Sequence, residues 1–440
     1  MPSRRTFIKG LAAAALPIFT GCATSVPSPN SRLQHAAIGV NGRGKAVLMG
    51  IKATHKVDVV ALCDVDANSL EEAGQAFPNA RRYSDWRELL EAENGRIDAV
   101  SVATPDHTHA PAAMSAIRRG KHVFCEKPLA HDVHEVRQLT RAARKAGAVT
   151  QMGIQMHAHS AYQSAVEILR GGAIGKVKEW HSWCKSRYSS PGKKRPLGED
   201  PIPPHLNWDV WIGVAPMRPF KQGVYHPDQW RSWRDFGGGV LGDFGCHIFD
   251  PVFTALQIGP PVSIYAETPE TDEEVWPEWS IIHYEFSGNK LTEGRTVRAI
   301  WYDGGKQPSL ADLPLGEEVT LPGDGSLIIG TAGIMILPHC EEAKLYPATR
   351  FQSYPRPQTE RRHHLAQWVE ACLSGGEPDA NFDFSGPLTE AVLLGTVAQR
   401  CPGVTLKWDA DKMKITNHPE ANSHLARPYR AGWEIKDLSA

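Results

Sequence analysis

The amino-acid sequence predicts an α/β protein with two domains: a doubly wound parallel sheet followed by an α+β domain. Between residues 34 and 155, short apolar strand-like segments alternate with helix-like segments, as in parallel sheets covered by helices. Further strand-like segments follow between residues 156 and 440. A chain of 440 residues is too long for one ordinary core, so 34–155 and 156–440 are assigned to separate domains.

The composition is that of a globular protein and excludes some classes of partner. The 48 basic and 49 acidic residues nearly cancel, so the sequence gives no reason to expect nucleic acid or an anionic membrane surface as a partner. Seven cysteines follow Cys22, and no pair has metal-ligand spacing such as C-x-x-C. We expect mostly buried free thiols and no metal site.

The first 33 residues are predicted to be a targeting segment. Ser3-Arg4-Arg5-Thr6-Phe7-Ile8-Lys9 fits a twin-arginine export pattern and precedes an apolar run that is too short to span a membrane stably. The following Phe19-Thr20-Gly21-Cys22 resembles a lipoprotein cleavage box, which makes Cys22 a candidate lipid anchor. The sequence therefore predicts an exported protein that is periplasmic or membrane-anchored, with a plain cleaved signal as the alternative to lipidation.

The elements of the first domain are predicted from short apolar runs and the turns between them. In chain order they are a strand at 36–40, a helix ending near 53, strands at 57–63 and 97–103, a helix at 111–119, a strand at 122–125, and a closing segment at 151–155.

The turn after the first strand has the context of a dinucleotide-binding Rossmann loop: strand, tight turn, helix, and an acid 20 residues after Gly44. Asn41 replaces the usual middle glycine, but asparagine tolerates left-handed backbone angles and Gly42 is adjacent. The acid, Asp64, would accept hydrogen bonds from ribose hydroxyls and repel a 2′-phosphate, which favours NAD over NADP. The cofactor-binding residues predicted here are Gly39, Asn41, Gly42, Arg43, Gly44 and Asp64.

Two further stretches carry a family resemblance. Residues 102–109, VATPDHTH, and 124–129, FCEKPL, resemble the signatures of the glucose-fructose oxidoreductase/inositol dehydrogenase/MocA (Gfo/Idh/MocA) family. The resemblance implies that Lys127 reaches the active site, that the second domain is a large, mostly antiparallel open sheet, and that the protein is a homo-oligomer. It also implies a set of residues near the nicotinamide: Thr104, Pro105, His107, His109 and Glu126.

The second domain is predicted to begin with a helix at 160–169. Its strands are expected at 177–184, 262–267, 280–286 and 297–302, and a late helix at 387–399. A proline-rich stretch at 187–220 is too long for an ordinary connection. Because residues 207–213 within it are strongly aromatic, we expect an ordered wall of the site there.

The stretch FGGGVLGDFGCHIFD at 236–250 contains G-x-G-x-x-G outside the strand context of a nucleotide loop. Asp243, His247 and Asp250 are spaced i, i+4, i+7, so on a helix they share one face. A divalent-metal site and a structural helix with a buried histidine are two interpretations. The third follows from the resemblance: Asp243 and His247 match a D-x-x-x-H motif that faces the nicotinamide together with Lys127.

Our mechanistic hypothesis makes His247 the base that removes a hydroxyl proton, with Lys127 stabilising the oxygen and Asp243 orienting its neighbours. Trp230 and Arg231 are candidates for contacting a sugar, and Gln155 and His157 for lining the same pocket. The predicted protein is an exported NAD-dependent oxidoreductase acting on a sugar, sugar derivative or polyol. The alternatives are an NAD-dependent glycoside hydrolase that oxidises C3 transiently, and a non-catalytic carbohydrate-binding relative.

Overall fold

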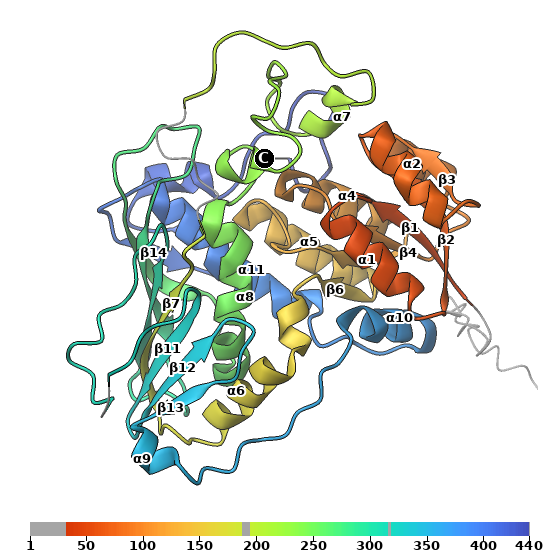
Figure 1. Ribbon diagram of the computed structural model, residues 1–440. Coiled ribbons are helices and arrows are strands. Elements are labelled where there is room, and N and C mark those ends of the chain that lie inside the picture. Colours follow the sequence, from red (N-terminus) through yellow and green to blue (C-terminus); the bar gives the residue numbers. More distant parts are fainter. Residues whose placement is uncertain (1–31, 187–193, 316–317, 440) are drawn as a thin grey trace, which may run out of the picture.

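The computed structural model describes residues 32–186, 194–315 and 318–439. The predicted export segment, with Cys22, therefore lies outside the described residues except for its last two positions. Two sheets dominate the described part of the chain, and Figure 1 shows the first domain on the right and the second on the left.

The first domain is a six-stranded sheet with the order β3-β2-β1-β4-β5-β6, in which all paired strands are parallel. This confirms the predicted doubly wound sheet. Its strands are β1 (Leu33–Ile38), β2 (Val57–Cys63), β3 (Arg81–Tyr83), β4 (Ala99–Val102), β5 (His122–Cys125) and β6 (Thr150–Met152).

Helices connect these strands, and three of them begin at aspartate caps whose carboxylates accept backbone N–H groups: Asp66 for α2, Asp85 for α3 and Asp132 for α5. The helices are α1 (Arg43–Lys52), α2 (Ala67–Ala76), α3 (Trp86–Ala92), α4 (Asp106–Arg118) and α5 (Val133–Ala146).

The start of α4 differs from the prediction, which placed it at Pro111. The helix begins at Asp106 and continues through Pro111. Proline has no N–H to donate to the carbonyl of His107, four residues earlier. That carbonyl instead accepts a hydrogen bond from the Arg427 guanidinium at 2.7 Å, so a distant residue compensates for the missing helical bond.

The second domain is built on a nine-stranded sheet with the order β13-β12-β11-β7-β10-β9-β8-β14-β15. Its neighbouring strands are antiparallel except for the parallel pair β7 and β10, which confirms a mostly antiparallel sheet. Its strands are β7 (Val177–Trp183), β8 (Pro261–Glu267), β9 (Ile281–Ser287), β10 (Thr296–Tyr302), β11 (Gly325–Gly330), β12 (Ile334–Pro338), β13 (Lys344–Tyr346), β14 (Leu406–Asp409) and β15 (Lys414–Ile415).

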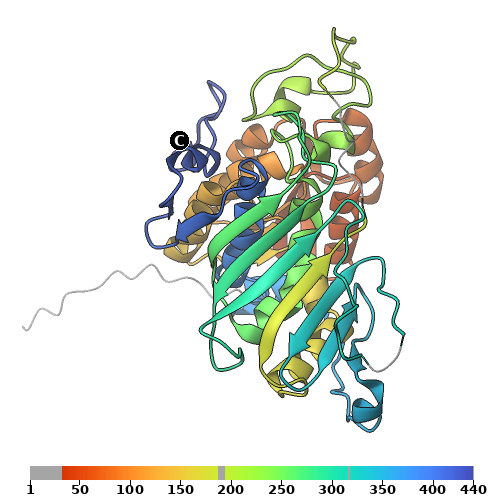
Figure 2. The ribbon, with the colours of Figure 1, turned by 90° about the vertical axis from the view of Figure 1, so that its left-hand side faces the viewer.

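Helices cover one face of this sheet, and Figure 2 shows the opposite face open toward the viewer. Phe249 of α8 packs on Trp180 and Trp301 of the sheet. Nearly every residue of α8 is buried, because the helix packs against the sheet, α6 and α11. The helices are α6 (Ser160–Arg170), α7 (Trp208–Ile212), α8 (Gly239–Leu256), α9 (Ala348–Phe351), α10 (His364–Ser374) and α11 (Phe382–Gln399), with short 3-10 turns η1 (Gln155–Ala158), η2 (Gln229–Ser232) and η3 (Pro419–His424).

The C-terminal part of the chain returns to the first domain. Trp368 of α10 packs against Phe124 of β5, with ring centroids 5.7 Å apart, and belongs to one apolar cluster with Val47 and Ile51 of α1. Trp433 packs near Trp86 of α3, with ring centroids 6.4 Å apart. The covering of the first sheet is therefore completed by residues more than 200 positions further along the chain.

The seven cysteines of the described residues are all free, and five of them are buried, in agreement with the expectation of mostly buried thiols. Among the helices of the described ranges, none combines the length and apolarity required to cross a membrane. Nor do the described side chains include a group of three or more histidines, cysteines or acids placed to hold a metal ion.

Candidate active site

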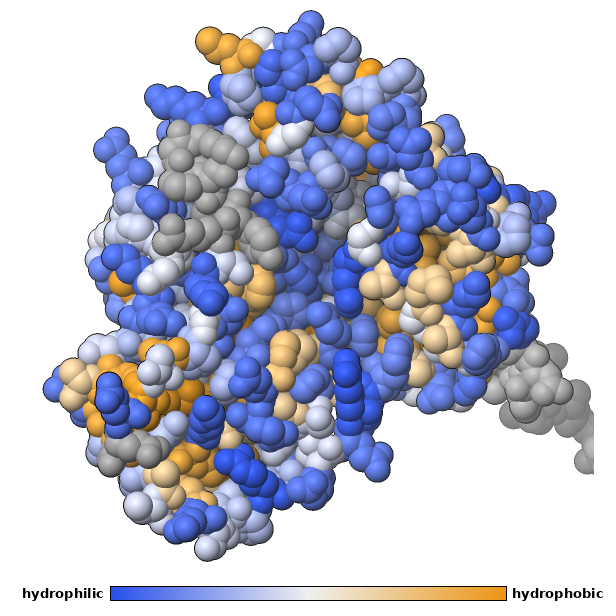
Figure 3. Space-filling model, in the orientation of Figure 1, coloured by the Kyte–Doolittle hydropathy of each residue, from blue (hydrophilic) through white to orange (hydrophobic). Residues whose placement is uncertain are grey.

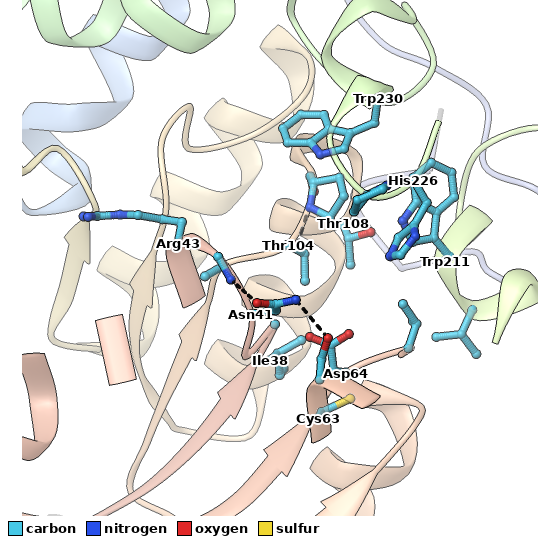
Figure 4. Close-up of a pocket in the computed structure, with 18 of the residues that line it drawn as sticks. Ile38, Asn41, Arg43, Cys63, Asp64, Thr104, Thr108, Trp211, His226 and Trp230 are labelled. Carbon is cyan, nitrogen blue, oxygen red and sulfur yellow. Dashed lines mark hydrogen bonds between the residues drawn. The ribbon is translucent and has the colours of Figure 1, made fainter. Parts of the chain in front are cut away.

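A cavity of about 390 Å³ lies at the carboxyl ends of the first-domain strands. Its floor is formed by the turn at residues 39–43, by Asp64 and by Thr104, and its roof by Trp211, His226 and Trp230 of the second domain (Figure 4). Ligands of open α/β sheets bind at this edge. The cavity therefore joins the predicted cofactor loop to aromatic side chains that are more than 150 residues away in the sequence.

The turn between β1 and α1 requires glycine at two positions. Gly39 has φ of 83°, and a Cβ there would overlap the carbonyl oxygen of Ala103. A Cβ at Gly44 would overlap the carbonyl oxygen of Gly39. These are the roles that the first and third glycines have in dinucleotide loops: a tight turn and close packing of helix against strand.

Asn41 stabilises the turn at the position where the middle glycine is usual. Its Oδ1 accepts the N–H of Gly42 at 2.7 Å, and its Nδ2 donates to Ser69 Oγ at 3.1 Å (Figure 4). Helix α1 begins directly afterwards with no side-chain cap. The first N–H groups of such a helix are suited to a pyrophosphate, so the residues present fit a dinucleotide.

Asp64 points into the cavity from the end of β2 (Figure 4). Its Oδ2 accepts the N–H of Val40 at 2.9 Å, and its Oδ1 accepts the N–H of Asp66 at 3.0 Å. Burial raises the pKa of this carboxyl, while these two backbone bonds counteract the shift. The carboxylate is thus held rigidly beside the position that the ribose of a dinucleotide would take, within reach of its hydroxyls.

Replacement of Asp64 by asparagine is expected to weaken NAD binding about tenfold and to raise the relative affinity for NADP, because a charged acceptor is lost and repulsion of a 2′-phosphate is relieved. Titration with both nucleotides by calorimetry measures this. Asp58→Asn, on the same strand but half exposed and paired with Arg32, is the control and should leave both affinities unchanged. If Asp64→Asn lost the same factor of affinity for NAD and for NADP, the proposed preference for NAD would be contradicted.

Arg43 lines the cavity but does not turn its charge toward Asp64. Its side chain extends away from Asp64 (Figure 4) and binds Glu126 Oε1 through Nε at 2.7 Å. Its Nη2 lies 3.3 Å from Gln155 Oε1. Arg43, Glu126 and Gln155 thus form a separate polar cluster beside the cavity.

Thr104 and Pro105 line the cavity, whereas the structure places His107 and His109 behind its wall. The ring nitrogens of His107 lie 2.9 Å from the carbonyl oxygen of Trp211 and 3.3 Å from that of Phe236. Those of His109 lie 2.7 Å from the oxygen of Pro128 and 2.8 Å from that of Thr104. Burial lowers the pKa of both imidazoles. They connect α4 to neighbouring backbone segments.

Lys127 and Asp243 meet although 116 residues separate them. Lys127 Nζ donates to the carbonyl oxygen of Asp243 at 3.0 Å and also to its Oδ1. Arg231 Nε lies 3.3 Å from Asp243 Oδ2. Burial acts against both charges, but the ion pair prevails: the pKa of Lys127 is raised and that of Asp243 is lowered. Both side chains are therefore charged at neutral pH.

His247 lies one turn after Asp243 on α8, and the helix carries both as the spacing predicted. Burial, followed by the positive charge of Lys127, lowers the pKa of His247 well below its usual value. The ring is therefore neutral at pH 7, but the same two effects make it a weaker base than a free imidazole, unlike the near-neutral pKa that the hypothesis assumed. Its Nδ1 is buried without a hydrogen-bond partner among the described residues, and its ring centroid lies 6.0 Å from that of His339.

Asp250, the third residue of this helix face, has a separate role. Its Oδ1 lies 2.8 Å from His157 Nδ1 and accepts a hydrogen bond from Thr254 at 3.0 Å. Although burial opposes protonation, Asp250 raises the pKa of His157. His157 lines a different surface cavity, so the structure does not bring it to the cofactor site, whereas Trp230 and Arg231 do line that site.

The glycine-rich stretch opens α8, and close packing explains two of its glycines. A Cβ at Gly237 would stand 2.8 Å from ring atoms of Trp230. Gly239 has φ of 65°, and its Cβ would stand 2.8 Å from the ring of Trp276. The stretch passes between two tryptophans, and side chains larger than hydrogen do not fit there.

Some lining residues were not predicted individually. Trp211 falls in the aromatic stretch that indicated an ordered wall, whereas His226 and Asp228 carry no sequence signal. Backbone contacts between the β2–α2 turn and a roof segment (residues 205–233) bring them over the cavity. Ala67 N–H donates to His205 O, and Asn207 N–H to Val65 O, both at 2.8 Å. Figure 3 shows a hydrophilic hollow between the two domains on this side of the molecule.

Fold and site together define a two-domain, dinucleotide-binding oxidoreductase with a charged cluster beside the cofactor cavity. The family described as "Oxidoreductase family, NAD-binding Rossmann fold" matches residues 33–154, and "Oxidoreductase family, C-terminal alpha/beta domain" matches residues 179–297. The chain belongs to this Gfo/Idh/MocA family of oxidoreductases.

Curated relatives include levoglucosan dehydrogenase of Pseudarthrobacter phenanthrenivorans, 27% identical over 41% of this chain and 37% of the relative. Myo-inositol 2-dehydrogenase of Thermotoga maritima is 28% identical over 39% of this chain and 47% of the relative. The matches thus cover less than half of these relatives' length.

Solved structures of similar fold include the WlbA dehydrogenase from Bordetella pertussis in complex with NADH and UDP-GlcNAcA. It has a TM-score of 0.60 and 17% identity, with 86% of this chain and 100% of that chain covered. Aldose-aldose oxidoreductase from Caulobacter crescentus, complexed with glycerol, has a TM-score of 0.58 and 19% identity, with 86% and 99% covered. These likenesses extend over both domains.

Proposed function

We propose that the protein is an exported, NAD-dependent oxidoreductase that transfers hydride between a hydroxyl of a sugar, sugar derivative or polyol and a tightly bound nicotinamide. One observation carries the proposal. Lys127 of the first domain binds Asp243 of α8 beside the cavity, and Arg231 both lines that cavity and contacts Asp243. His247 lies one turn further along α8, near enough for the charge of Lys127 to lower its pKa. The named activities of the sugar and polyol dehydrogenases among the relatives support the substrate class.

Oxidation of a secondary hydroxyl requires loss of its proton as hydride leaves the carbon, and a bound nicotinamide supplies the hydride acceptor. Two bonds from Lys127 go to Asp243, which leaves the third N–H of the ammonium for a substrate oxygen. Neutral His247 takes the proton, while the carboxylate of Asp243 keeps Lys127 charged and in place. Arg231 and Trp230 contact the sugar.

The roof segment supports tight retention of the cofactor. It is pinned to the β2–α2 turn by backbone hydrogen bonds, and its aromatic side chains pack into a cluster of their own. A dinucleotide in the cavity would therefore be enclosed by both domains. NAD is favoured over NADP because the carboxylate of Asp64 would accept hydrogen bonds from the ribose hydroxyls of NAD and repel the 2′-phosphate of NADP.

We further propose export through the N-terminal segment, with Cys22 as a candidate lipid anchor, and assembly into a homo-oligomer. The open face of the nine-stranded sheet supports the oligomer (Figure 2). Tyr265 and Ile300 flank His283 on this face, and all three are only half-buried. Ile281 pairs with Tyr302 beside them.

Retention of the cofactor is directly testable. Freshly purified protein is expected to release about one NAD(H) per chain on denaturation, because release from the native state requires opening of the roof segment. An enzymatic cycling assay of the supernatant measures this. An empty supernatant from protein isolated in its cytoplasmic form would overturn tight binding.

The substrate class is tested by adding sugars, polyols and aryl glycosides to the same protein while absorbance of the reduced nicotinamide is followed. We expect a sugar or polyol, with levoglucosan and myo-inositol as first probes, to reduce the bound cofactor. Release of the aglycone without net reduction would instead assign the protein to NAD-dependent glycoside hydrolysis. If no compound reduces the nicotinamide or releases an aglycone, and the protein also contains no cofactor, the proposed enzymatic activity is refuted and the carbohydrate-binding alternative remains.

A further inference from the structure

Asp106 places a buried carboxylate at the junction of the two domains. It is the first residue of α4 and is only 4% exposed. Its Oδ2 accepts the backbone N–H of Gly238 at 3.0 Å. Gly238 is the N-cap position of α8, which has no side-chain cap of its own. The first domain therefore supplies the acceptor that the N-terminus of α8 lacks.

The same carboxylate takes part in the charged cluster of the site. The positive groups facing it are Lys127 and Arg231, and the negative group is Asp243; the thiols of Cys125 and Cys246 lie near it on β5 and α8. The positive charges of Lys127 and Arg231 are thus balanced by two negative charges, that of Asp243 on α8 and that of ionised Asp106. Burial raises the pKa of Asp106 to about 7, against the opposing effect of the two cations.

Two glycines at the start of α8 lie next to Asp106. A Cβ at Gly238 would stand 3.8 Å from Asp106 Oδ2 and would also crowd the Cα of Gly242 at 2.9 Å. A Cβ at Gly242 would stand 4.0 Å from the same oxygen. The two distances to Asp106 are ordinary contacts, so the carboxylate lies directly against the start of α8, and it is the Cα of Gly242 that a side chain at Gly238 would crowd.

We propose that Asp106 is a positioning residue with two effects: its side-chain oxygen holds the N-terminus of α8 against the first domain, and its negative charge balances Lys127 and Arg231 and so keeps the cluster with Asp243 in its working arrangement. The catalytic consequence rests on the proposed function, whereas the structural consequence does not. Activity then rises as pH increases through the titration of Asp106, because protonation removes the charge that balances Lys127 and Arg231. Titration of His247 does not produce this rise, since its pKa lies well below the usual value.

The activity test compares Asp106→Asn, which retains an acceptor for Gly238 but no charge, with Asp106→Ala, which retains neither. With levoglucosan or myo-inositol as the probe, wild-type kcat/KM is expected to rise with pH around 7. In Asp106→Asn this rise disappears and kcat/KM above pH 8 falls about tenfold; in Asp106→Ala it falls about a hundredfold. A pH rise that persists unchanged in Asp106→Asn overturns the catalytic role.

Asp303→Asn is the matched control. Asp303 is also buried, and burial raises its pKa to about 6, but it binds Ser280 and Trp301 in the second sheet. A buried carboxylate that matters only for folding should leave the pH profile unchanged. Loss of the pH rise in Asp303→Asn as well would show that the profile reports general stability, and it would overturn the assignment to Asp106.

A substrate-free measurement separates this proposal from the proposed function. Hydrogen exchange followed by mass spectrometry should show faster exchange of the N–H groups of residues 238–243 in Asp106→Ala than in Asp106→Asn or the wild type, with other helices unchanged. This result together with no turnover of any sugar would uphold Asp106 and refute the oxidoreductase. Wild-type exchange at these positions in Asp106→Ala would overturn the positioning role.

Discussion

Replacement of Lys127 by methionine is expected to lower the rate of hydride transfer to bound nicotinamide about a thousandfold. Methionine has a similar length but lacks the N–H that would meet the substrate oxygen, so developing negative charge loses its stabilising partner. Single-turnover absorbance of the reduced nicotinamide measures the rate, and nicotinamide content after denaturation shows that binding is retained.

Lys56→Met is the matched control for this substitution. Lys56 is an exposed lysine whose ion pair with Glu370 is also exposed, and it should leave the rate unchanged. The Lys127 variant also leaves Asp243 with Arg231 as its only described cationic partner, so a melting curve should accompany the kinetics. Retention of more than about a tenth of the wild-type rate in a folded Lys127→Met protein would exclude this cluster as the catalytic centre.

Replacement of Gly44 by alanine is expected to abolish cofactor binding and to destabilise the first domain by several kcal/mol. The added methyl group would overlap the backbone carbonyl oxygen of Gly39, and Gly39 is itself confined by Ala103. Because neither obstacle is a flexible side chain, helix α1 must move away from β1. Nicotinamide content and the unfolding midpoint in urea measure the two effects.

Gly95→Ala is the control for added volume alone. Gly95 is exposed and does not have a positive φ, and a methyl group there would meet no atom within 4 Å. Its substitution should leave both nicotinamide content and the urea midpoint near those of the wild type. Normal nicotinamide content in Gly44→Ala would mean that the β1–α1 turn is not the cofactor loop.

Local patterns predicted most of the regular structure. The strand at 57–63 is found where its apolar run placed it, and Asp243 and His247 do lie on a helix, the condition under which their spacing puts them on one face. Asp64 and the residues of the turn before α1 lie together as the loop spacing indicated. The predicted start of α4 was wrong. The helix continues through Pro111 because Arg427, far along the chain, donates to the carbonyl that Pro111 leaves without a helical partner, and local sequence cannot show that bond.

The functions of individual polar residues were less predictable. His157 was predicted to line the pocket because it follows the last strand of the first domain, but it pairs with Asp250 instead. Asp106 lies inside the VATPDHTH motif, yet no local pattern indicates its role, because its partner Gly238 is 132 residues away. A hydrogen bond or ion pair between such residues depends on how helices pack, and residue spacing does not contain that information.

Local sequence features were enough to predict the two-domain class, the turn before α1 together with Asp64, and the helix face shared by Asp243 and His247. These features depend on short-range periodicity and on the backbone freedom of glycine and asparagine, which act within a few residues. The family resemblance had already implied that Asp243 and His247 face Lys127. The closing of the cavity by the roof segment and the contact of Asp106 with Gly238 could be seen only in the packed structure. These contacts join segments separated by more than a hundred residues. They form because the two sheets and their helices bury their apolar surfaces against each other, and this packing fixes how the charged side chains between them are arranged.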